Sequence, residues 1–239
     1  LEKGWITRGV TVPDPAFLSE YDLLVFALYP HDVVRFAEEN QSYFKKGALL
    51  TDVTGVKCGV VDAVQAILRP DLEFIGAHPM AGREYSGFKY ARDDLFDHAS
   101  MILCGHGDDD PAVLQRARDF FMELGFLRVQ FTTPKTHDEM IAYTSQLAHV
   151  VSSAYVKCPL ADKHRGFSAG SFADMTRVAR LNEDMWTELF FDNREALLPV
   201  VEDLVQRVTE YRDALRDEDR EGMRKLLREG RETKERLTD

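Results

Sequence analysis

One histidine of the sequence stands where a general base would be expected. His78 ends a short apolar run, and Pro79 after it holds the backbone of His78 extended. Gly76 and Gly82 lie on either side, so a ligand can approach the backbone closely. Histidine exchanges protons near neutral pH and is the commonest general base in enzymes. Position alone leaves a second interpretation open, in which the imidazole only binds carbonyl groups of its own loop.

Arg177 is a candidate for binding a carboxylate. A guanidinium offers two parallel N–H groups that match the two oxygens of a carboxylate. The preceding segment, 166–171, consists mostly of small residues, as is common beside a pocket. Asp174 stands three residues before Arg177, however, and would form an exposed ion pair with it on one helix. Spacing alone does not decide between these two interpretations.

Two further histidines lie on one expected helix, but their spacing does not suit a shared metal ion. His137 and His149 are twelve residues apart. At ~100° per residue, this leaves their side chains ~120° apart around the helix axis. His149 shares a face with Ser145 instead. We therefore predict no metal site and interpret each of the two histidines, taken alone, as a surface or capping residue.

No phosphate-binding glycine motif follows any of the expected strands. The pattern G-x-G-x-x-G is absent, and the nearest sequence is GHG at 105–107. The aspartates at 108–110 would repel a pyrophosphate. Asp110 directly precedes Pro111 and better fits the N-cap of a helix.

Short apolar runs alternate with amphipathic stretches in the first half of the chain. The apolar runs predict strands at 23–28, 48–53, 73–77, 100–104 and 126–131. Helical spacing predicts helices at 32–43, 56–68 and 111–124. This alternation is typical of a Rossmann-like α/β domain with a largely parallel sheet. Ligands of such sheets bind beyond the carboxyl ends of the strands, where the polar segments 29–31, 51–57 and 78–82 fall.

From Pro134 onward the sequence has helical spacing almost throughout. The expected helices lie at 134–156, 171–181, 184–191 and 193–215, with a kink or restart at Pro199 in the last. We place a domain boundary near Thr133, giving an α/β domain at 1–133 and an all-α domain at 134–239. The long apolar stripe of the last helix suggests packing against a second copy of the chain, as a homodimer.

Composition excludes several classes of protein. The 239 residues include 30 Lys and Arg against 41 Asp and Glu, a net charge of −11, which argues against a nucleic-acid surface. No apolar run approaches the ~20 residues of a membrane span. The three cysteines, Cys58, Cys104 and Cys158, are far apart, which suggests reduced thiols and a cytoplasmic location.

Four motifs together resemble the prephenate dehydrogenase family. They are DVTGVK at 52–57, GAHPMAGREYSG at 76–87, HD at 137–138 with SQLAH at 145–149, and DMTRVA at 174–179. The resemblance implies a nicotinamide-dinucleotide domain followed by a helical domain that forms the dimer. It also implies oxidative decarboxylation of prephenate, or of arogenate, in tyrosine biosynthesis, with NAD or alternatively NADP as the cofactor.

The resemblance assigns roles to individual residues around the substrate. His78 would be the catalytic histidine, accepting the proton of the ring hydroxyl as hydride leaves. Arg177 would bind a substrate carboxylate, His149 would contact the substrate, and Glu84 would lie at the pocket entrance. Burial would favour neutral His78 and the substrate carboxylates its protonated form, so the direction of its pKa shift stays open.

The resemblance also gives the cofactor a border and reveals one departure from the family. The expected border residues are Ala27, Tyr29, Pro30, Asp52 and Gly55. The family usually has a serine where Gly55 stands, and the hydroxyl of Thr54, one residue earlier, would take its place at the substrate.

A second departure concerns the start of the sequence. The glycine-rich turn that holds the pyrophosphate in this family has no counterpart here, and residue 1 is not Met. We expect a chain that lacks its first ~40–60 residues, since a βαβ opening needs ~30 residues or more. One alternative is a related hydroxyacid dehydrogenase with the same two-domain plan. Another is a non-catalytic short form that binds a tyrosine-like ligand or a partner chain.

Overall fold

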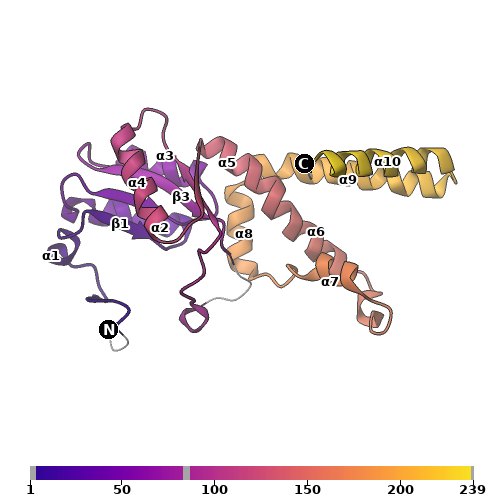
Figure 1. Cartoon of the computed structure of the whole chain (residues 1–239), viewed down its shortest axis with the longest axis horizontal. Coiled ribbons are helices and arrows are strands. Elements are labelled where there is room, and N and C mark those ends of the chain that lie inside the picture. Colours follow the sequence, from indigo (N-terminus) through magenta and orange to yellow (C-terminus); the bar gives the residue numbers. More distant parts are fainter. Residues whose placement is uncertain (1–3, 83–86, 238–239) are drawn as a thin grey trace. The chain divides into compact units, whose positions relative to one another are not determined.

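The computed structural model describes residues 4–82 and 87–237. The chain divides into two compact units, Leu1–Asn193 and Arg194–Asp239, which are described separately below (Figure 1).

The first unit is built on a mixed β-sheet. Among the described residues, five strands form this sheet, and their spatial order follows the sequence. The strands are β1 (Leu23–Phe26), β2 (Leu49–Asp52), β3 (Glu73–Pro79), β4 (Ser100–Cys104) and β5 (Arg128–Thr132). β1, β2 and β3 run parallel to one another, β4 is antiparallel to β3, and β5 is parallel to β4.

One edge of the sheet collects the carboxyl ends of three strands. Phe26 at the end of β1 pairs with Asp52 at the end of β2, and β2 pairs in the same direction with β3. Because β4 runs the other way, its beginning lies at this edge too, where Met101 pairs with Pro79. The sheet therefore places the segments after Phe26, Asp52 and Pro79 side by side.

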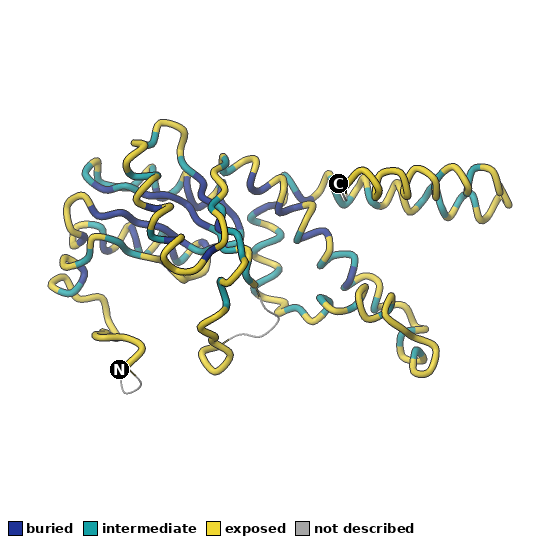
Figure 2. The backbone as a smooth tube through the Cα atoms, viewed as in Figure 1, coloured by how far each residue is buried: buried dark blue, intermediate teal, exposed yellow. Residues whose placement is uncertain are grey.

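Helices cover both faces of the sheet because neighbouring strand residues point to opposite sides. Leu50 and Phe74 pack with residues of α2 (Pro30–Asn40) and α3 (Cys58–Ile67). Leu49 and Ile75 pack instead with Ala117 and the rest of the buried face of α4 (Pro111–Glu123). Figure 2 shows the strands as the most continuously buried part of this unit. A short helix, α1 (Pro15–Leu18), precedes β1.

A second group of helices follows the sheet within the same unit. They are α5 (Pro134–Ile141), a π-helical turn (Ala142–Gln146), α6 (Leu147–Val156), α7 (Gly170–Thr176) and α8 (Glu183–Asp192). α5, the π turn and α6 run on without a break. Thr133 caps α5, since its hydroxyl accepts a hydrogen bond from the backbone N–H of Thr136 at 3.1 Å. Short 3₁₀ turns lie at Gln41–Tyr43, Phe88–Tyr90 and Ala161–Lys163.

The second unit is a helical hairpin of α9 (Arg194–Arg216) and α10 (Arg220–Arg236). The hydroxyl of Tyr211 on α9 donates to the carbonyl oxygen of Leu226 on α10 at 3.4 Å. α9 continues through Pro199 as one helix, so the restart expected there is wrong. Val205, Val208 and other apolar residues of α9 are exposed.

The structure confirms the expected fold class of a Rossmann-like domain followed by helices. The Asp110 carboxylate caps α4 as expected, accepting from the backbone N–H of Ala112 at 2.8 Å. The helix expected at 171–181 is shorter and ends at Thr176. Thr133, the expected domain boundary, lies between β5 and α5 inside the first compact unit, whereas the division into units falls after Asn193. No helix in the described part of the chain is long and apolar enough to cross a membrane.

Candidate active site

His78 is the first member of a line of hydrogen-bonded side chains. β3 places it at the sheet edge, and its Nδ1 lies 2.8 Å from Nε2 of His137 on α5. The other ring nitrogen of His137, Nδ1, lies 2.7 Å from Oδ1 of Asp138. His137 is 2% exposed and Asp138 is 4% exposed. The line His78–His137–Asp138 therefore runs from the sheet edge into a region closed to water.

Asp138 is fixed by the backbone of two other segments. Its two carboxylate oxygens accept hydrogen bonds from the backbone N–H groups of Lys57 and Cys58, both at 2.8 Å. These N–H groups stand at the start of α3, which has no cap from its own N-cap side chain. The carbonyl oxygen of Asp138 accepts from Nδ2 of Asn193 at 2.9 Å. Asp138 thus caps α3 from a distant helix and orients His137 at the same time.

His137 was expected to be a surface or capping residue, and this expectation is wrong. His137 and Ile141 are four residues apart on α5 and both are buried, so they share the face that packs on the rest of the unit. That i, i+4 relation was the available signal. The contact with His78 joins residues 59 positions apart in the sequence and had no local signal.

Asp52 and Thr54 form a second buried group with Lys57. The Asp52 carboxylate forms an ion pair with Lys57 Nζ, and the side chains of both are fully buried. It also accepts from the backbone N–H of Ala77 at 2.9 Å, which ties β2 to β3. Asp52 was expected to border the cofactor. Its carboxylate points inward, because Lys57 and the backbone N–H of Ala77 hold it there.

The Thr54 hydroxyl is also occupied by internal partners. It hydrogen-bonds with the Asp52 carboxylate and lies 2.8 Å from both the carbonyl oxygen of Val56 and Nζ of Lys57. A hydroxyl has one donor and two acceptor positions, so its single O–H is shared between the Asp52 carboxylate and the Val56 carbonyl, while Lys57 donates to one lone pair. The expected contact between this hydroxyl and a substrate stays a prediction. Thr54 shapes the loop between β2 and α3.

Burial sets the protonation of the first histidine. It lowers the pKa of His78 to about 3, with smaller contributions from His137 and from the cation of Lys57, against the opposing effect of Asp138. Burial alone would raise the pKa of Asp138, but hydrogen bonds from His137 and from the backbone of Cys58 and Lys57 hold it below its usual value. His78 is therefore neutral and Asp138 ionised at neutral pH.

An open groove lies at the carboxyl ends of β1 and β2. Its volume is about 540 Å³, and its walls include Ala27, Tyr29, Pro30, Gly55 and, from α8, Leu189. Four of the five residues expected to border a cofactor thus line one groove, together with Thr54. This is the position at which α/β sheets bind their ligands.

His78 lies beside Gly55, a residue of the groove wall, but is not itself among the residues that line the groove. A Cβ atom built on Gly55 would lie 3.6 Å from Cδ2 of Leu189 and 4.0 Å from Cε1 of His78. Both distances are ordinary van der Waals contacts, so the position has room for the serine that the family usually carries. Cε1 of His78 therefore lies toward Gly55, and the neighbouring Nδ1 is hydrogen-bonded to His137.

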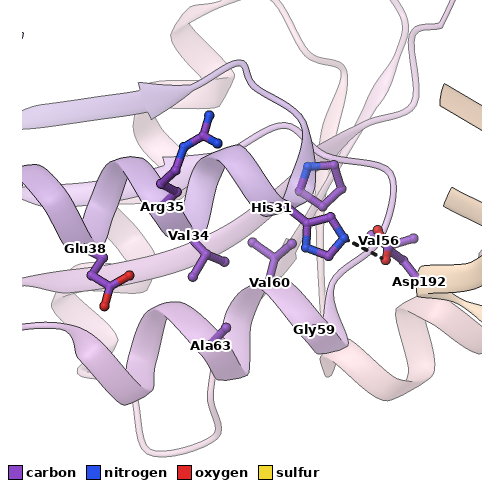
Figure 3. A pocket seen from close by; sticks show the side chains of 10 residues that line it. His31, Val34, Arg35, Glu38, Val56, Gly59, Val60, Ala63 and Asp192 are labelled. Carbon is purple, nitrogen blue, oxygen red and sulfur yellow. Dashed lines mark ion pairs between the residues drawn. The ribbon is translucent and has the colours of Figure 1, made fainter. Parts of the chain in front are cut away.

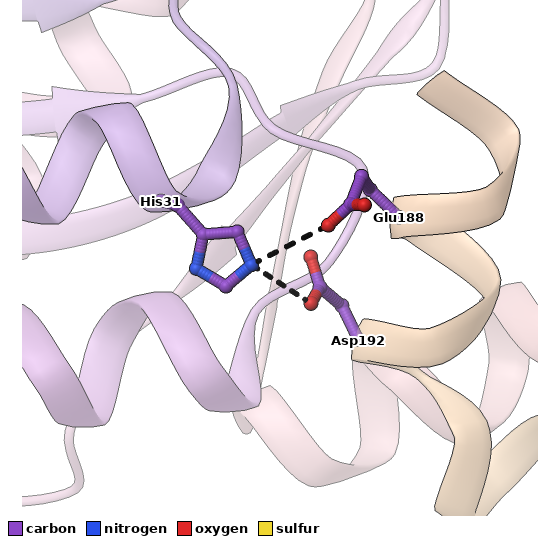
Figure 4. A group of neighbouring side chains, drawn as sticks. All are labelled: His31, Glu188 and Asp192. Carbon is purple, nitrogen blue, oxygen red and sulfur yellow. Dashed lines mark ion pairs between the residues drawn. The ribbon is translucent and has the colours of Figure 1, made fainter. Parts of the chain in front are cut away.

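A second groove lies between α2 and α3 (Figure 3). Its volume is about 430 Å³, its floor is apolar, and it shares Pro30 with the first groove. At one end, Nε2 of His31 lies 3.4 Å from Oδ1 of Asp192 and 3.7 Å from Oε2 of Glu188 on α8 (Figure 4). The ligand atoms of these three side chains lie within 4.8 Å of one another, a grouping that sequence spacing did not predict.

His149 contacts the segment that carries Arg177. The His149 ring on α6 stacks on Trp186 of α8, with ring centroids 3.9 Å apart, and its Nδ1 is 3.2 Å from the carbonyl oxygen of Val178. Val178 follows Arg177, an exposed residue at the end of α7. The residues that line the two grooves include neither His149 nor Arg177. Glu84 lies outside the described residues.

Comparison with known proteins agrees with this architecture. The nucleotide-binding domain model of prephenate dehydrogenase matches residues 9–129, just over half of the chain. The dimerization domain model of prephenate dehydrogenase matches residues 133–229. The chain belongs to the prephenate dehydrogenase family.

Curated relatives within the prephenate dehydrogenase family share about a quarter to a third of the aligned residues. The prephenate dehydrogenase of Bacillus subtilis is 27% identical over 199 residues, which is 80% of this chain and 53% of that protein. The cyclohexadienyl dehydrogenase of Zymomonas mobilis is 30% identical over 182 residues, which is 73% of this chain and 61% of that protein. The chain thus spans between half and two thirds of the length of these relatives.

Solved structures of family members show the same fold. The prephenate dehydrogenase of A. aeolicus, in complex with hydroxyphenyl propionate and NAD+, superposes with a TM-score of 0.82 and 24% identity, covering 99% of this chain and 83% of that one. The arogenate dehydrogenase of Synechocystis superposes with a TM-score of 0.78 and 22% identity, covering 94% and 82% of the two chains.

Proposed function

We propose that this protein catalyses the NAD-dependent oxidative decarboxylation of prephenate or arogenate, as one step of tyrosine biosynthesis. The names of its relatives support this class of reaction. The observation that carries the proposal is the position of His78, a neutral imidazole at the sheet edge that lies beside Gly55, a residue of the groove wall.

His78 acts as the general base of the reaction. The ring hydroxyl of the substrate gives its proton to His78 as the carbon that bears it is oxidised. NAD, when bound, supplies the acceptor for the hydride that leaves this carbon. Loss of carbon dioxide then makes the ring aromatic, which drives the step forward. Burial keeps His78 unprotonated in the resting protein, so its lone pair is available at neutral pH.

The first groove suits one end of the dinucleotide. Small side chains at Ala27 and Gly55 and the start of α2 at Pro30 leave space for a flat ring beside His78. We assign no residue of this chain to the pyrophosphate, since the aspartates at 108–110 are unsuited to it. NADP remains the alternative to NAD.

Substrate binding is assigned to residues of the helical segments. Arg177 binds a carboxylate of the substrate, and His149 contacts the substrate from α6. The contact of His149 with the backbone of Val178 supports this assignment, because it brings His149 against the segment that carries Arg177.

The helical part of the chain serves for pairing with a second copy. The match of residues 133–229 to a dimerization domain supports this, as do exposed apolar residues of α9 such as Val205 and Val208. The domain boundary accordingly stays near Thr133. We place the protein in the cytoplasm, a reducing compartment that suits its three free cysteines.

A turnover assay with a matched histidine variant tests the proposal. The wild type is mixed with prephenate or arogenate and with NAD or NADP, and formation of the reduced nicotinamide is followed by its absorbance. His78→Asn should lower kcat by about 10²-fold or more, since the base is lost, with only a small change in KM. His106→Asn, an exposed histidine of the loop before α4, is the control and should leave kcat unchanged. Equal rates for His78→Asn and wild type would remove the base assignment, and ligand binding without turnover would favour the non-catalytic alternative.

A further inference from the structure

The line of side chains behind His78 has a direction. We propose that His137 and Asp138 act as positioning residues that fix His78 with its proton on Nδ1, so that Nε2 takes the substrate proton and the charge passes to His137. This inference rests on the proposed function for the identity of the substrate, but its first part concerns the resting protein alone.

The direction starts at the carboxylate. Asp138 is ionised and can only accept hydrogen bonds. Its oxygens accept from the backbone N–H groups of Lys57 and Cys58, and Oδ1 also lies 2.7 Å from Nδ1 of His137. Nδ1 of His137 must therefore carry a proton. Neutral His137 then has its lone pair on Nε2.

The same reasoning continues to the next ring. Nε2 of His137 and Nδ1 of His78 are 2.8 Å apart, and two lone pairs at this distance would repel. His78 therefore donates from Nδ1, and its own lone pair is on Nε2. Cε1, the carbon bonded to both nitrogens of His78, lies against Gly55 at the groove. The basic atom is thus on the part of the ring turned away from His137.

Charge balance favours moving the proton inward. The buried group holds two carboxylates, Asp52 and Asp138, and one cation, Lys57, which pairs with Asp52. The thiols of Cys58 and Cys104 add no charge, because burial raises the pKa of each to about 12. Asp138 is therefore the uncompensated anion of the group. An imidazolium at His137 would neutralise it, whereas an imidazolium confined to His78 would be farther from it.

The transfer balances as follows. The substrate hydroxyl gives its proton to Nε2 of His78, and His78 gives the proton on Nδ1 to Nε2 of His137. His78 ends neutral with its proton on Nε2, and His137 becomes an imidazolium bonded to Asp138. The hydride leaves the same substrate carbon for the oxidised nicotinamide, and the bond to the leaving carboxylate breaks to release carbon dioxide. The electron pair of the broken bond makes the ring aromatic and leaves a phenolate oxygen. His137 returns its proton through His78 to this oxygen, which gives the phenol and resets the base.

Nitrogen-15 NMR of the imidazole rings in the wild-type chain tests the direction without any need for turnover. Neutral imidazole has distinct nitrogen shifts for its two tautomers, and the two rings are assigned by loss of their signals in His78→Asn and His137→Gln. We expect both His78 and His137 as Nδ1–H tautomers. An Nε2–H tautomer at His78 would overturn the proposal.

Two substitutions at His137 distinguish its two proposed roles, which are to orient the His78 ring and to receive the proton from it. The side-chain oxygen of His137→Gln can still accept from Nδ1 of His78 but cannot take its proton, whereas His137→Phe removes the acceptor as well. We expect the His78 tautomer to be kept in His137→Gln and lost in His137→Phe. His106→Asn is again the control. An unchanged tautomer in folded His137→Phe would show that His137 does not set it.

The kinetics of the same variants test the proposed proton transfer from His78 to His137. We expect kcat to fall about 10-fold to 100-fold in His137→Gln with KM unchanged. Wild-type values in His137→Gln would overturn the transfer to His137. If the wild type itself shows no turnover, the proposed function fails, while the tautomers still decide the positioning of His78.

Discussion

Two groupings of histidine and carboxylate in the first unit use the same residue types in opposite settings. His137 and Asp138 are buried, with 2.7 Å between Nδ1 and Oδ1 and with backbone N–H groups on both carboxylate oxygens. His31 faces Glu188 and Asp192 at 3.7 and 3.4 Å, and its side chain is 74% exposed. This difference shows that exposure to water, more than residue type, decides how firmly the contacts of such a pair are fixed. In the buried pair every proton position is set, whereas water competes for each contact in the exposed one.

The largest expected difference is in stability. Asp138→Asn replaces one carboxylate oxygen that accepts a backbone N–H with an NH2 group that cannot accept, and it removes the negative charge beside His137. We expect the free energy of unfolding to fall by about 3 kcal/mol or more, as for other broken buried pairs. Glu188→Gln is the comparison at the exposed grouping, where the Glu188 side chain is 61% exposed, and should cost less than about 1 kcal/mol. Urea denaturation of both variants gives the two values. Similar losses would break the comparison.

The pH dependence of the free energy of unfolding should come in part from His78. The pKa of His78 falls from 6.5 in the unfolded chain to about 3 in the folded one. Between these values the unfolded state binds one more proton, so stability is present above pH 6.5 and is lost as the pH falls toward 3. The slope from this group is at most about 1.4 kcal/mol per pH unit. His78→Asn should flatten the curve of unfolding free energy against pH in this window. A curve parallel to that of the wild type would show that His78 takes up its proton freely.

The smallest expected effect is at the exposed grouping. His31→Ala removes both contacts to α8 and should change the free energy of unfolding by less than about 1 kcal/mol. Whatever loss occurs should shrink further in high salt, because exposed charges are screened. Thermal unfolding at low and high salt measures this. A loss as large as that of Asp138→Asn would instead show that the contacts of His31 hold α2 to α8.

Much of the fold followed from the sequence because hydrophobic period is local. The run at 23–28 and the helix that begins at Pro111 are set by neighbours within a few residues. Asp110 before Pro111 was recognisable as an N-cap for the same reason. The restart expected at Pro199 was wrong, because this proline stands near the start of α9 and the helix runs on through it.

The site was harder to predict, since its contacts are long-range. His78 was recognisable from the strand end and the proline after it. Its partner His137 was not, because adjacent residues of a helix do not normally face each other, and the pair His137-Asp138 therefore gave no sign of a bond. Asp52 looked like a ligand group after a strand. Its inward direction depends on Lys57, whose burial follows from the packing of α3 and could not be read from spacing.

The π turn between α5 and α6 has a consequence for how this unit can vary. Its wider coil takes up extra chain without breaking the helix, so the rotational phase of everything downstream is offset from that of a regular helix. One continuous rod can therefore aim His137 at the sheet and His149 at Trp186, although regular winding would not by itself relate the two directions. Substitutions in α6 can then change the surroundings of His149 without disturbing His137 on α5.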